Sequence, residues 1–274
     1  MFPTPVSEIM AVAKVEEVQE DVLSPGLVAK IRAELGKTGD VLKRALGKVI
    51  GLFDARASLV FIDRSLLTVK QTFVRLHEAA HGFLSWQRPM YQVVEDCEDA
   101  LEPGVADAFD REANVFAAEV LFQLDAFATE AADRKFSVFT PVNMAKSYGA
   151  SVYASIRQYV AKHHKSCAVL VLNPPVLVEG DGFTAELRRP VQSESFTEMF
   201  GAMAWPETFT PDDQIGAIVP IGRKASKPRP IVLTDRNGIE HECLAEAFNN
   251  KWNVFVLIHE VKALTSTSAV VFKG

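Results

Sequence analysis

The amino-acid sequence predicts an α+β protein with three successive parts. We expect a mainly helical domain with a short sheet over 1–136, a helical segment over 137–165, and a second α+β domain over 166–274. Two observations support this division. Apolar residues recur at helical spacing through most of the first part and the middle segment. From Cys167 onward, short β-rich runs alternate with turns, which predicts a sheet.

The composition is that of an ordinary globular protein. Of the 274 residues, 48% are hydrophobic and 23% are charged, enough to build two cores. The net charge of −6 excludes a protein that binds nucleic acid with its whole surface, although a local basic patch remains possible. Cys97, Cys167 and Cys243 are sparse and odd in number, which predicts no disulfide framework. Because no apolar leader or membrane-length apolar run is present, we expect a soluble, cytoplasmic protein.

The N-terminal part predicts helices followed by one strand. An apolar stripe runs from Leu27 to Ile50 at helical spacing, with a break expected at the glycine-containing stretch 36–39. Residues 57–63 are rich in β-formers and predict a single strand. We expect one edge of that strand to be free, where it can hold an extended peptide by backbone pairing.

The next helix carries the motif H-E-A-A-H. Thr68 and Gln71 fit a capping box at its start, and Pro89 marks its end. His77 and His81 are four residues apart, so both imidazoles lie on one helix face and can bind one zinc ion. Glu78 follows the first histidine and is placed to act as a general base. The alternative is a core helix with two incidental histidines.

An acidic stretch separates this helix from the next. It contains Glu95-Asp96-Cys97-Glu98-Asp99, and Pro103-Gly104 predicts a turn within it. The simplest interpretation is a solvated loop.

Residues 109–121 predict a second helix that completes the metal site. On a helical wheel Phe109, Ala113 and Phe116 form a buried face, and Glu112 falls in the same sector. A buried carboxylate is costly unless it is paired or bound to metal, so Glu112 is the expected third zinc ligand. Glu119 is the reserve candidate, and a salt bridge from Glu112 to an arginine is the alternative.

The segment 137–165 predicts a helical pair. Gly149 separates two helical patterns in the manner of a helix-turn-helix. The pair either supports the site structurally or reads DNA. His163 and His164 are adjacent and point in different directions, so they are poor partners for one metal ion.

The last part predicts strands, with a short helix over 194–203 and a hairpin turn at 235–238. The strands are expected at 168–172, 183–187, 215–220, 230–234 and 254–258. Basic residues form two clusters, which predict an anion-binding patch: Arg188 and Arg189, and then Arg223, Lys224, Lys227 and Arg229. Trp205 and Phe209 would offer stacking surfaces for the bases of single-stranded DNA. A solvated loop with scattered cations is the alternative.

H-E-A-A-H at 77–81 and R-E-A-N-V-F-A-A-E-V-L at 111–121 together resemble the ImmA/IrrE family of zinc metallopeptidases. The resemblance implies zinc held by His77, His81 and Glu112, with Glu78 as general base. It also implies that 166–274 is a GAF-like sensor domain and that 137–165 is helix-turn-helix-like. Two departures from the family pattern are expected: no N-terminal DNA-binding domain, and a long acidic insert that contains Cys97.

The resemblance further implies a zinc endopeptidase that cleaves a helix-turn-helix repressor in response to phage or DNA damage. Single-stranded DNA on the basic clusters would be the activator. Cys97 would act as an inhibitory fourth zinc ligand, as in the cysteine switch of matrix metalloproteinase precursors, because thiolate is a strong zinc ligand. A small buried cysteine is the alternative for Cys97. The competing functions are a non-catalytic DNA-binding regulator with structural zinc and a toxin protease.

Overall fold

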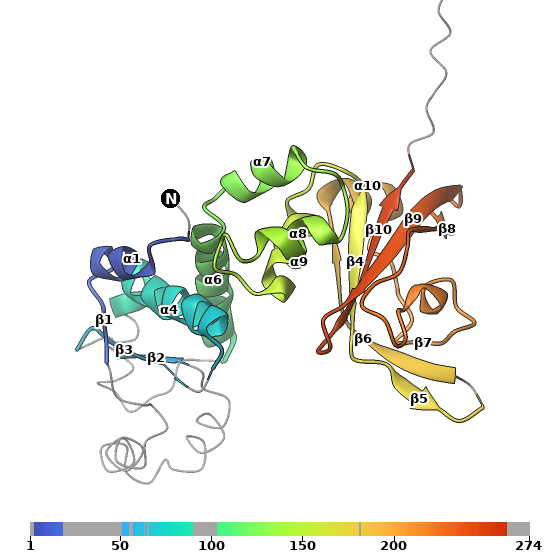
Figure 1. Cartoon of the computed structure of the whole chain (residues 1–274). Coiled ribbons are helices and arrows are strands. Elements are labelled where there is room, and N and C mark those ends of the chain that lie inside the picture. Colours follow the sequence, from blue (N-terminus) through green and yellow to red (C-terminus); the bar gives the residue numbers. More distant parts are fainter. Residues whose placement is uncertain are drawn as a thin grey trace, which may run out of the picture. The chain divides into compact units, whose positions relative to one another are not determined.

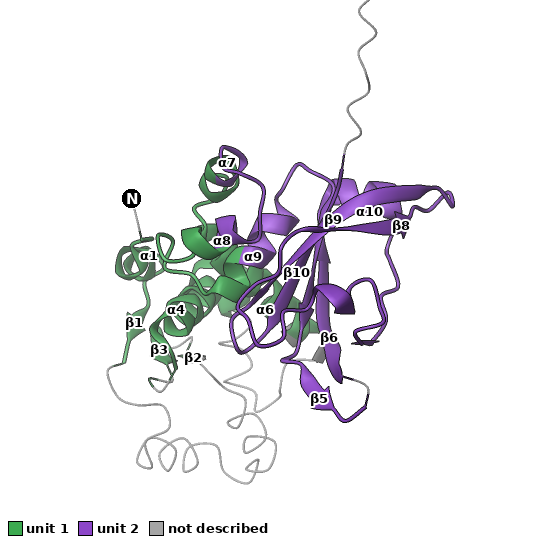
Figure 2. Cartoon of the chain, turned by 45° about the vertical axis from the view of Figure 1, so that its right-hand side comes forward, with its two compact units in different colours: residues 1–130, 142–155 green, residues 131–141, 156–274 purple. Residues whose placement is uncertain are grey.

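A computed structural model of the chain describes residues 3–18, 51–54, 57–62, 64, 66–89, 103–180 and 182–261. The predicted helices up to Ile50 and the acidic run around Cys97 lie outside these residues. The chain divides into two compact units, shown in Figure 2. Unit 1 comprises residues 1–130 and 142–155, and unit 2 comprises residues 131–141 and 156–274. The described residues form helices and sheets, which confirms the α+β class, whereas the predicted domain boundaries stay predictions.

Unit 1 contains a small sheet with the strand order β1-β3-β2 (Figure 1). Its strands are β1 (Glu16–Glu17), β2 (Gly51–Asp54) and β3 (Leu59–Ile62). β3 confirms the predicted strand, and its buried Val60 and Ile62 alternate with more exposed neighbours. The predicted free edge is wrong for this strand. β3 pairs with β1 in parallel on one side and with β2 antiparallel on the other, so both of its edges are occupied.

The motif helix α4 spans Thr68–Phe83, and α1 (Val6–Val12) precedes the sheet. The predicted capping box is wrong, because Leu67 is the N-cap and makes no side-chain cap bond. Gln71 instead donates to the carbonyl oxygens of Leu66 at 2.8 Å and Arg64 at 3.1 Å. The helix also ends before Pro89, at Phe83. These differences move the ends of the helix and leave the motif well inside it.

The packing of α4 on the sheet core is close near the end of the helix. Val74 and Ala79 join Val60 and Ile62 in one buried cluster. A Cβ atom added to Gly82 would lie 2.6 Å from Cγ1 of Val15, which real contacts do not allow. Glycine is therefore required there because of this close contact with Val15. Its backbone conformation is ordinary helix and would accept other residues.

Helix α6 spans Pro103–Leu121 and packs against α4. The predicted turn at 103–104 is wrong, because the helix begins there. Proline is well tolerated in the first turn of a helix, where its missing N–H is not needed. Ala113 and Ala117 are fully buried, and such small side chains allow two helices to approach closely.

The remaining helices before the large sheet are short. They are α7 (Ala126–Ala132), α8 (Phe139–Met144) and α9 (Val152–Ala161). The predicted pair within 137–165 is confirmed as two helices, α8 and α9, with Gly149 at φ +65 between them. In unit 1, the rings of Phe122, Phe127 and Tyr148 pack together, with centroids 4.7 to 6.1 Å apart.

Unit 2 is built on a seven-stranded sheet in which β5-β6-β4-β10-β9-β8 lie side by side and β7 pairs with β6 (Figure 1). The described pairings are antiparallel. The strands are β4 (Cys167–Leu172), β5 (Val176–Val178), β6 (Gly182–Gln192), β7 (Thr208–Phe209), β8 (Arg229–Thr234), β9 (Glu240–Asn249) and β10 (Val254–Glu260). β4 is buried along its whole length, as expected for a central strand.

Four of the five predicted strands of unit 2 are confirmed, within β4, β6, β8 and β10. The strand predicted at 215–220 is wrong, because Gly216–Ile218 form the 3-10 helix η2. A Cβ at Gly216 would lie 1.7 Å from the carbonyl oxygen of Thr210, so the backbone is packed tightly in this loop. The short helix is α10 (Glu194–Phe200), capped by Ser193, whose Oγ accepts from the Phe196 N–H.

The hairpin turn between β8 and β9 is confirmed. Oδ1 of Asp235 accepts from the backbone N–H groups of Asn237 at 2.8 Å and Ile239 at 2.9 Å. Gly238 has φ +83, a backbone conformation that residues other than glycine rarely adopt. The core of unit 2 lies between the sheet and α10, with Leu170, Phe196 and Val256 among its fully buried side chains.

Candidate metal centre

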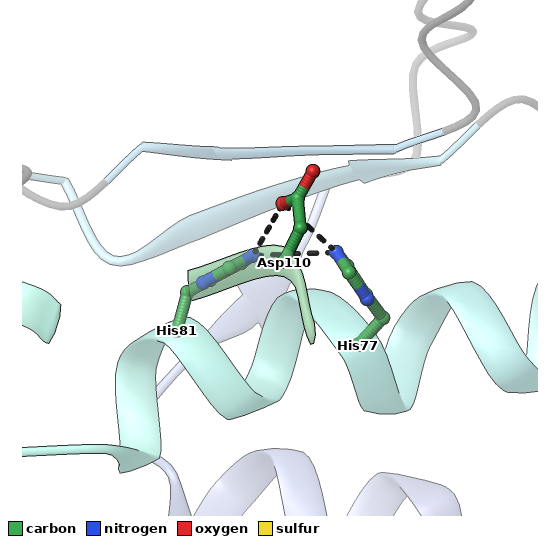
Figure 3. Close-up of side chains that lie close together, drawn as sticks. All are labelled: His77, His81 and Asp110. Atoms are coloured by element: carbon green, nitrogen blue, oxygen red, sulfur yellow. Dashed lines mark hydrogen bonds and ion pairs between the residues drawn. The ribbon is translucent and has the colours of Figure 1, made fainter. Parts of the chain in front are cut away.

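His77 and His81 converge from one face of α4. Their Nε2 atoms are 3.3 Å apart, and their rings meet edge to face with centroids 4.9 Å apart. Figure 3 shows both imidazoles turned toward the carboxylate of Asp110, which comes from α6. Oδ1 of Asp110 lies 3.8 Å from Nε2 of His77 and 4.0 Å from Nε2 of His81. The spacing of four residues thus places the two imidazoles as the sequence predicts.

These three side chains suit a zinc ion. One ligand atom from each lies within 4.8 Å of the others, so a single ion between them can reach all three. Two imidazoles and one carboxylate are the protein ligands of many catalytic zinc sites, which keep a fourth position open. Burial, then the charge of His81, lowers the pKa of His77 to about 4, and burial also lowers the pKa of His81. Both rings are therefore neutral near pH 7, the form that binds metal.

Glu78 is buried beside the histidines, with 7% of its surface exposed. Burial, then the negative charge of Asp110, raises the pKa of the Glu78 carboxyl to about 8. A buried carboxyl with so high a pKa in a site that also holds metal ligands is suited to exchanging protons near neutral pH. A nearby dication would favour its charged form and lower this pKa.

Glu112 does not join this group in the structure. Its side chain is exposed, so the expectation that it lies on the buried face of the helix is wrong. Its Oε2 accepts hydrogen bonds from Nε1 of Trp86 at 2.8 Å and from Nε2 of Gln87 at 2.7 Å, and these bonds lower its pKa. Neither partner is an arginine. The role of Glu112 as third ligand stays a prediction, and Asp110 occupies the position facing both histidines.

Helix geometry explains the difference between the two carboxylates. Residues two apart on an α-helix point about 200° apart. Asp110 and Glu112 therefore flank the buried stripe of Phe109, Ala113 and Ala117 on opposite sides. A helical wheel shows which residues lie at the two edges of such a stripe. Which edge faces the histidines depends on how α6 packs on α4, and the wheel does not show that.

Gln87 is a polar neighbour that sequence reasoning missed. It is fully buried, and its Oε1 lies 2.7 Å from Nδ1 of His81. Its Nε2 donates to Glu112 at 2.7 Å and more weakly to the carbonyl oxygen of Phe109 at 3.4 Å. No periodic pattern marks this residue, because it follows the end of α4 and meets its partners only through the tertiary fold.

The cysteine predictions have separate outcomes. Cys97 lies outside the described residues, so its role as an inhibitory zinc ligand stays a prediction. Cys167 and Cys243 are buried free thiols in unit 2. Burial raises the pKa of Cys167 to about 12 and that of Cys243 to about 11, so neither is a reactive thiolate at neutral pH.

Four of the six predicted basic residues line two hollows on unit 2. A hollow of about 780 Å³ is bordered by Arg223 and Lys224, and one of about 540 Å³ by Arg223, Lys227 and Arg229. Because Arg223 borders both, the two hollows adjoin.

The other side chains predicted for the anion-binding patch do not line these two hollows. Arg188 donates to Oδ1 of Asn253 at 3.0 Å, and Arg189 follows it on strand β6 with its side chain exposed. Phe209 is buried in the core and Trp205 packs against that core. The prediction of an open stacking surface is therefore wrong for Phe209, whereas it stays a prediction for the half-buried Trp205.

Comparisons with known proteins agree with the site-bearing part of the fold. Residues 41–155 match the model of the Peptidase_M78 family, the IrrE N-terminal-like domain. This stretch includes the histidine pair, Glu78 and both carboxylates of α6, so the family prediction is confirmed there. No curated protein matches the chain.

Among solved structures, a transcriptional regulator from Mycobacterium tuberculosis has a similar fold. It is 11% identical, with a TM-score of 0.52, and the match covers 99% of this chain and 88% of that one. At this identity the likeness concerns the fold alone. In the part of the chain that the structure describes, no helix is long and apolar enough to cross a membrane.

Proposed function

We propose that this chain, whose residues 41–155 match the IrrE N-terminal-like domain of a metallopeptidase family, is a zinc-dependent endopeptidase. Its substrate in this proposal is a helix-turn-helix transcriptional repressor, cleaved in response to phage or DNA damage. The observation that carries the proposal is the convergence of His77, His81 and Asp110 beside the buried carboxyl of Glu78. A purely structural zinc site has no need of such a carboxyl.

His77, His81 and Asp110 would hold the zinc ion. Zinc bound by three protein ligands polarises a substrate carbonyl and makes water a better nucleophile near neutral pH. We assign the third position to Asp110 because its Oδ1 lies within 4.0 Å of both histidine Nε2 atoms, whereas Glu112 faces Trp86 and Gln87. The distances leave room for an ion between the three side chains.

Glu78 would carry the proton. Its carboxylate accepts a proton from the attacking water and returns it to the amine of the leaving peptide. The burial that, together with the charge of Asp110, raises its pKa in the absence of a cation also limits the access of bulk water to that proton. The two histidines stay neutral and do not exchange protons in this scheme.

Cleavage of a purified repressor tests the proposal. The full chain is incubated with the helix-turn-helix protein of a neighbouring gene, with zinc or EDTA, and fragments are identified by mass spectrometry. We expect one zinc-dependent cleavage site, loss of cleavage by at least about 10³-fold in Glu78→Gln, and retained zinc. Asp125→Asn, an exposed carboxylate beyond the end of α6, serves as the matched control. If Glu78→Gln cleaves at the wild-type rate, Glu78 is not the base; if the wild type binds zinc but cuts nothing, the non-catalytic regulator is the better reading.

Asp110→Asn and Glu112→Gln decide the third ligand. Each removes one charge and keeps the shape of its side chain. We expect Asp110→Asn to weaken zinc binding strongly and Glu112→Gln to weaken it little. A strong loss in Glu112→Gln alone would return the ligand to the position that the family resemblance implies.

Regulation is the further part of the proposal. Residues 166–274 would form the GAF-like sensor, 137–165 would be helix-turn-helix-like, and Cys97 would close the fourth zinc position at rest. The adjoining hollows bordered by Arg223 support an anionic activator, for which single-stranded DNA is the candidate. Cleavage should rise with single-stranded DNA in the wild type, and Cys97→Ser should raise basal cleavage without it. Unchanged cleavage in both experiments would remove this part of the proposal and leave the endopeptidase intact.

A further inference from the structure

Glu112 is linked to the metal centre through a second side chain. Nε2 of the fully buried Gln87 donates to Oε2 of Glu112 at 2.7 Å. Oε1 of the same amide lies 2.7 Å from Nδ1 of His81. Nε2 of His81 then lies 3.3 Å from Nε2 of His77 and 4.0 Å from Asp110. One side chain, Gln87, thus connects the exposed carboxylate of Glu112 to Nδ1 of His81, on the far side of that ring from the candidate metal position.

The chemistry of the carboxylate fixes the direction of every hydrogen bond in this series. An ionised carboxylate only accepts hydrogen bonds, so the amide end that faces Glu112 must be the NH₂ group. The carbonyl end of Gln87 is then the one that faces His81. A carbonyl only accepts as well, so Nδ1 of His81 must carry the proton. In a neutral imidazole this leaves the lone pair on Nε2, the atom directed at His77 and Asp110.

The amide of Gln87 and the carboxylate of Glu112 are each held by one further contact. Nε1 of Trp86 donates to the same Glu112 oxygen at 2.8 Å, and the carbonyl oxygen of Phe109 accepts from Gln87 at 3.4 Å. A rotated amide would place the Gln87 carbonyl oxygen against two acceptors, Oε2 of Glu112 and the carbonyl oxygen of Phe109, which is costly for a buried group. The orientation is therefore determined by the surroundings and leaves His81 one favourable tautomer.

We propose that Glu112 and Gln87 are positioning residues of the metal centre, which together set the tautomer and the ring orientation of His81. The inference rests on the proposed function, in that the ion is zinc held by His77, His81 and Asp110. It gives the two carboxylates of α6 separate roles: Asp110 binds the ion, and Glu112 acts through Gln87 on the far side of His81. Outer partners of metal-bound histidines typically change metal affinity by about 10- to 100-fold.

Zinc titration against a competing chelator is the first test. Glu112→Ala removes the acceptor at the exposed end, and Gln87→Leu removes the acceptor of Nδ1. We expect about a 10-fold loss of zinc affinity in Glu112→Ala and up to about 100-fold in Gln87→Leu. Glu112→Gln keeps a carbonyl oxygen that accepts from Gln87 and Trp86, so it should lose no more than about 3-fold. Asp125→Asn is the matched control, and thermal unfolding in EDTA checks that each variant is folded.

The tautomer of His81 is the second test, and it needs no metal. Long-range ¹H–¹⁵N correlation spectra of the metal-free full chain, labelled at histidine, report which ring nitrogen carries the proton. The wild type and Glu112→Gln should show a protonated Nδ1 in His81. Gln87→Leu should show a mixture of tautomers. A change of packing alone would not move the proton from one nitrogen to the other.

The outcomes separate this inference from the proposed function. If the wild type binds no zinc through His77 and His81, the proposed function fails, and the tautomer spectra still decide the orientation of His81. If zinc binds but Glu112→Ala and Gln87→Leu keep wild-type affinity and a protonated Nδ1, the inference fails alone. If Glu112→Gln abolishes binding as completely as Asp110→Asn, Glu112 is itself a ligand and the inference is overturned.

Discussion

The two units both bury histidines, but they surround them differently. The chain has six histidines, with His77 and His81 in unit 1 and the other four in unit 2. Burial is the main reason that the pKa of His77 and of His163 falls to about 4. The lowered pKa therefore does not by itself distinguish the candidate metal ligand His77 from His163.

The side chains that surround the histidines differ between the two units. The Nε2 atoms of His77 and His81 face each other with the Asp110 carboxylate beside them. In unit 2, His163 and His259 pack their rings on Phe136, with centroids 4.8 and 4.7 Å from it. Nδ1 of His163 accepts from the backbone N–H of Lys165, so it is already engaged. Convergent ligand atoms beside a carboxylate, rather than burial, indicate a metal site.

His241 is a third case. Asp235 lies 3.2 Å from its Nε2 and Glu260 lies 3.5 Å from its Nδ1. The two carboxylates flank opposite nitrogens of one ring, so no single ion can contact all three side chains through the same ring atom. Carboxylates near a histidine therefore indicate a metal site only when they lie on the same side of the ring.

The largest expected effect concerns zinc affinity. His81→Ala should weaken zinc binding by about 10²-fold or more. The free energy of zinc binding at a structural site is roughly 10–16 kcal/mol, and each ligand contributes a share of it. His163→Ala should leave it unchanged. Isothermal titration or chelator competition measures both. Equal losses in the two variants would abolish the distinction between the two units.

The next effect concerns acid stability. The folded pKa of His163 lies below the ordinary value of 6.5, so the unfolded chain binds that proton more tightly. The folded state is therefore favoured above pH 6.5 and loses this advantage as the pH falls toward 4. The slope is at most about 1.4 kcal/mol per pH unit for one histidine.

His163→Asn keeps an acceptor for the Lys165 N–H but does not titrate. Urea unfolding of the full chain at pH 7.5 and pH 5.0 should show a smaller loss of stability in this variant than in the wild type. An identical loss in both proteins would show that His163 does not contribute to the pH dependence. Comparing the slopes removes the effect of the smaller side chain on packing.

The smallest effect belongs to His241. Its side chain is partly exposed and its contacts with Asp235 and Glu260 are single contacts at 3.2 and 3.5 Å, of the kind that contributes little to stability. His241→Gln keeps some hydrogen-bonding capacity and should shift the thermal midpoint by no more than about 2–4 °C. Differential scanning calorimetry at low and high salt provides the measurement, and a much larger shift would show that these contacts matter more than their exposure suggests.

The parts of the site that depend on local spacing were predictable from sequence. His77 and His81 share a helix face because of their separation along the chain, and Glu78 follows from the same motif. The choice between Asp110 and Glu112 was not predictable, because both flank one apolar stripe and only the packing of α6 against α4 distinguishes them. Gln87 left no signal, since its side-chain partners lie on two different helices, His81 on α4 and Phe109 and Glu112 on α6.

In the fold, too, the features that depend on local sequence were predictable and those that depend on tertiary packing were not. Strands with uninterrupted apolar runs, such as β4 and β10, were identified from composition. β9 was missed because it begins with Glu240-His241-Glu242, polar residues at the end of the strand beside the hairpin turn. The strand expected at 215–220 is a 3-10 helix, because the tight approach of Gly216 to Thr210 imposes a turn on an apolar run.

The close packing at Gly82 has a consequence for how this protein tolerates change. The residue directly follows His81, and the space that its missing side chain leaves is filled by Val15. The position of His81, a candidate metal ligand, therefore depends on a segment more than sixty residues earlier in the chain. A single added methyl group at 82 must displace either that segment or the end of α4. A substitution near Val15 can therefore shift the candidate metal ligand His81 through steric contact, without altering any residue of the motif.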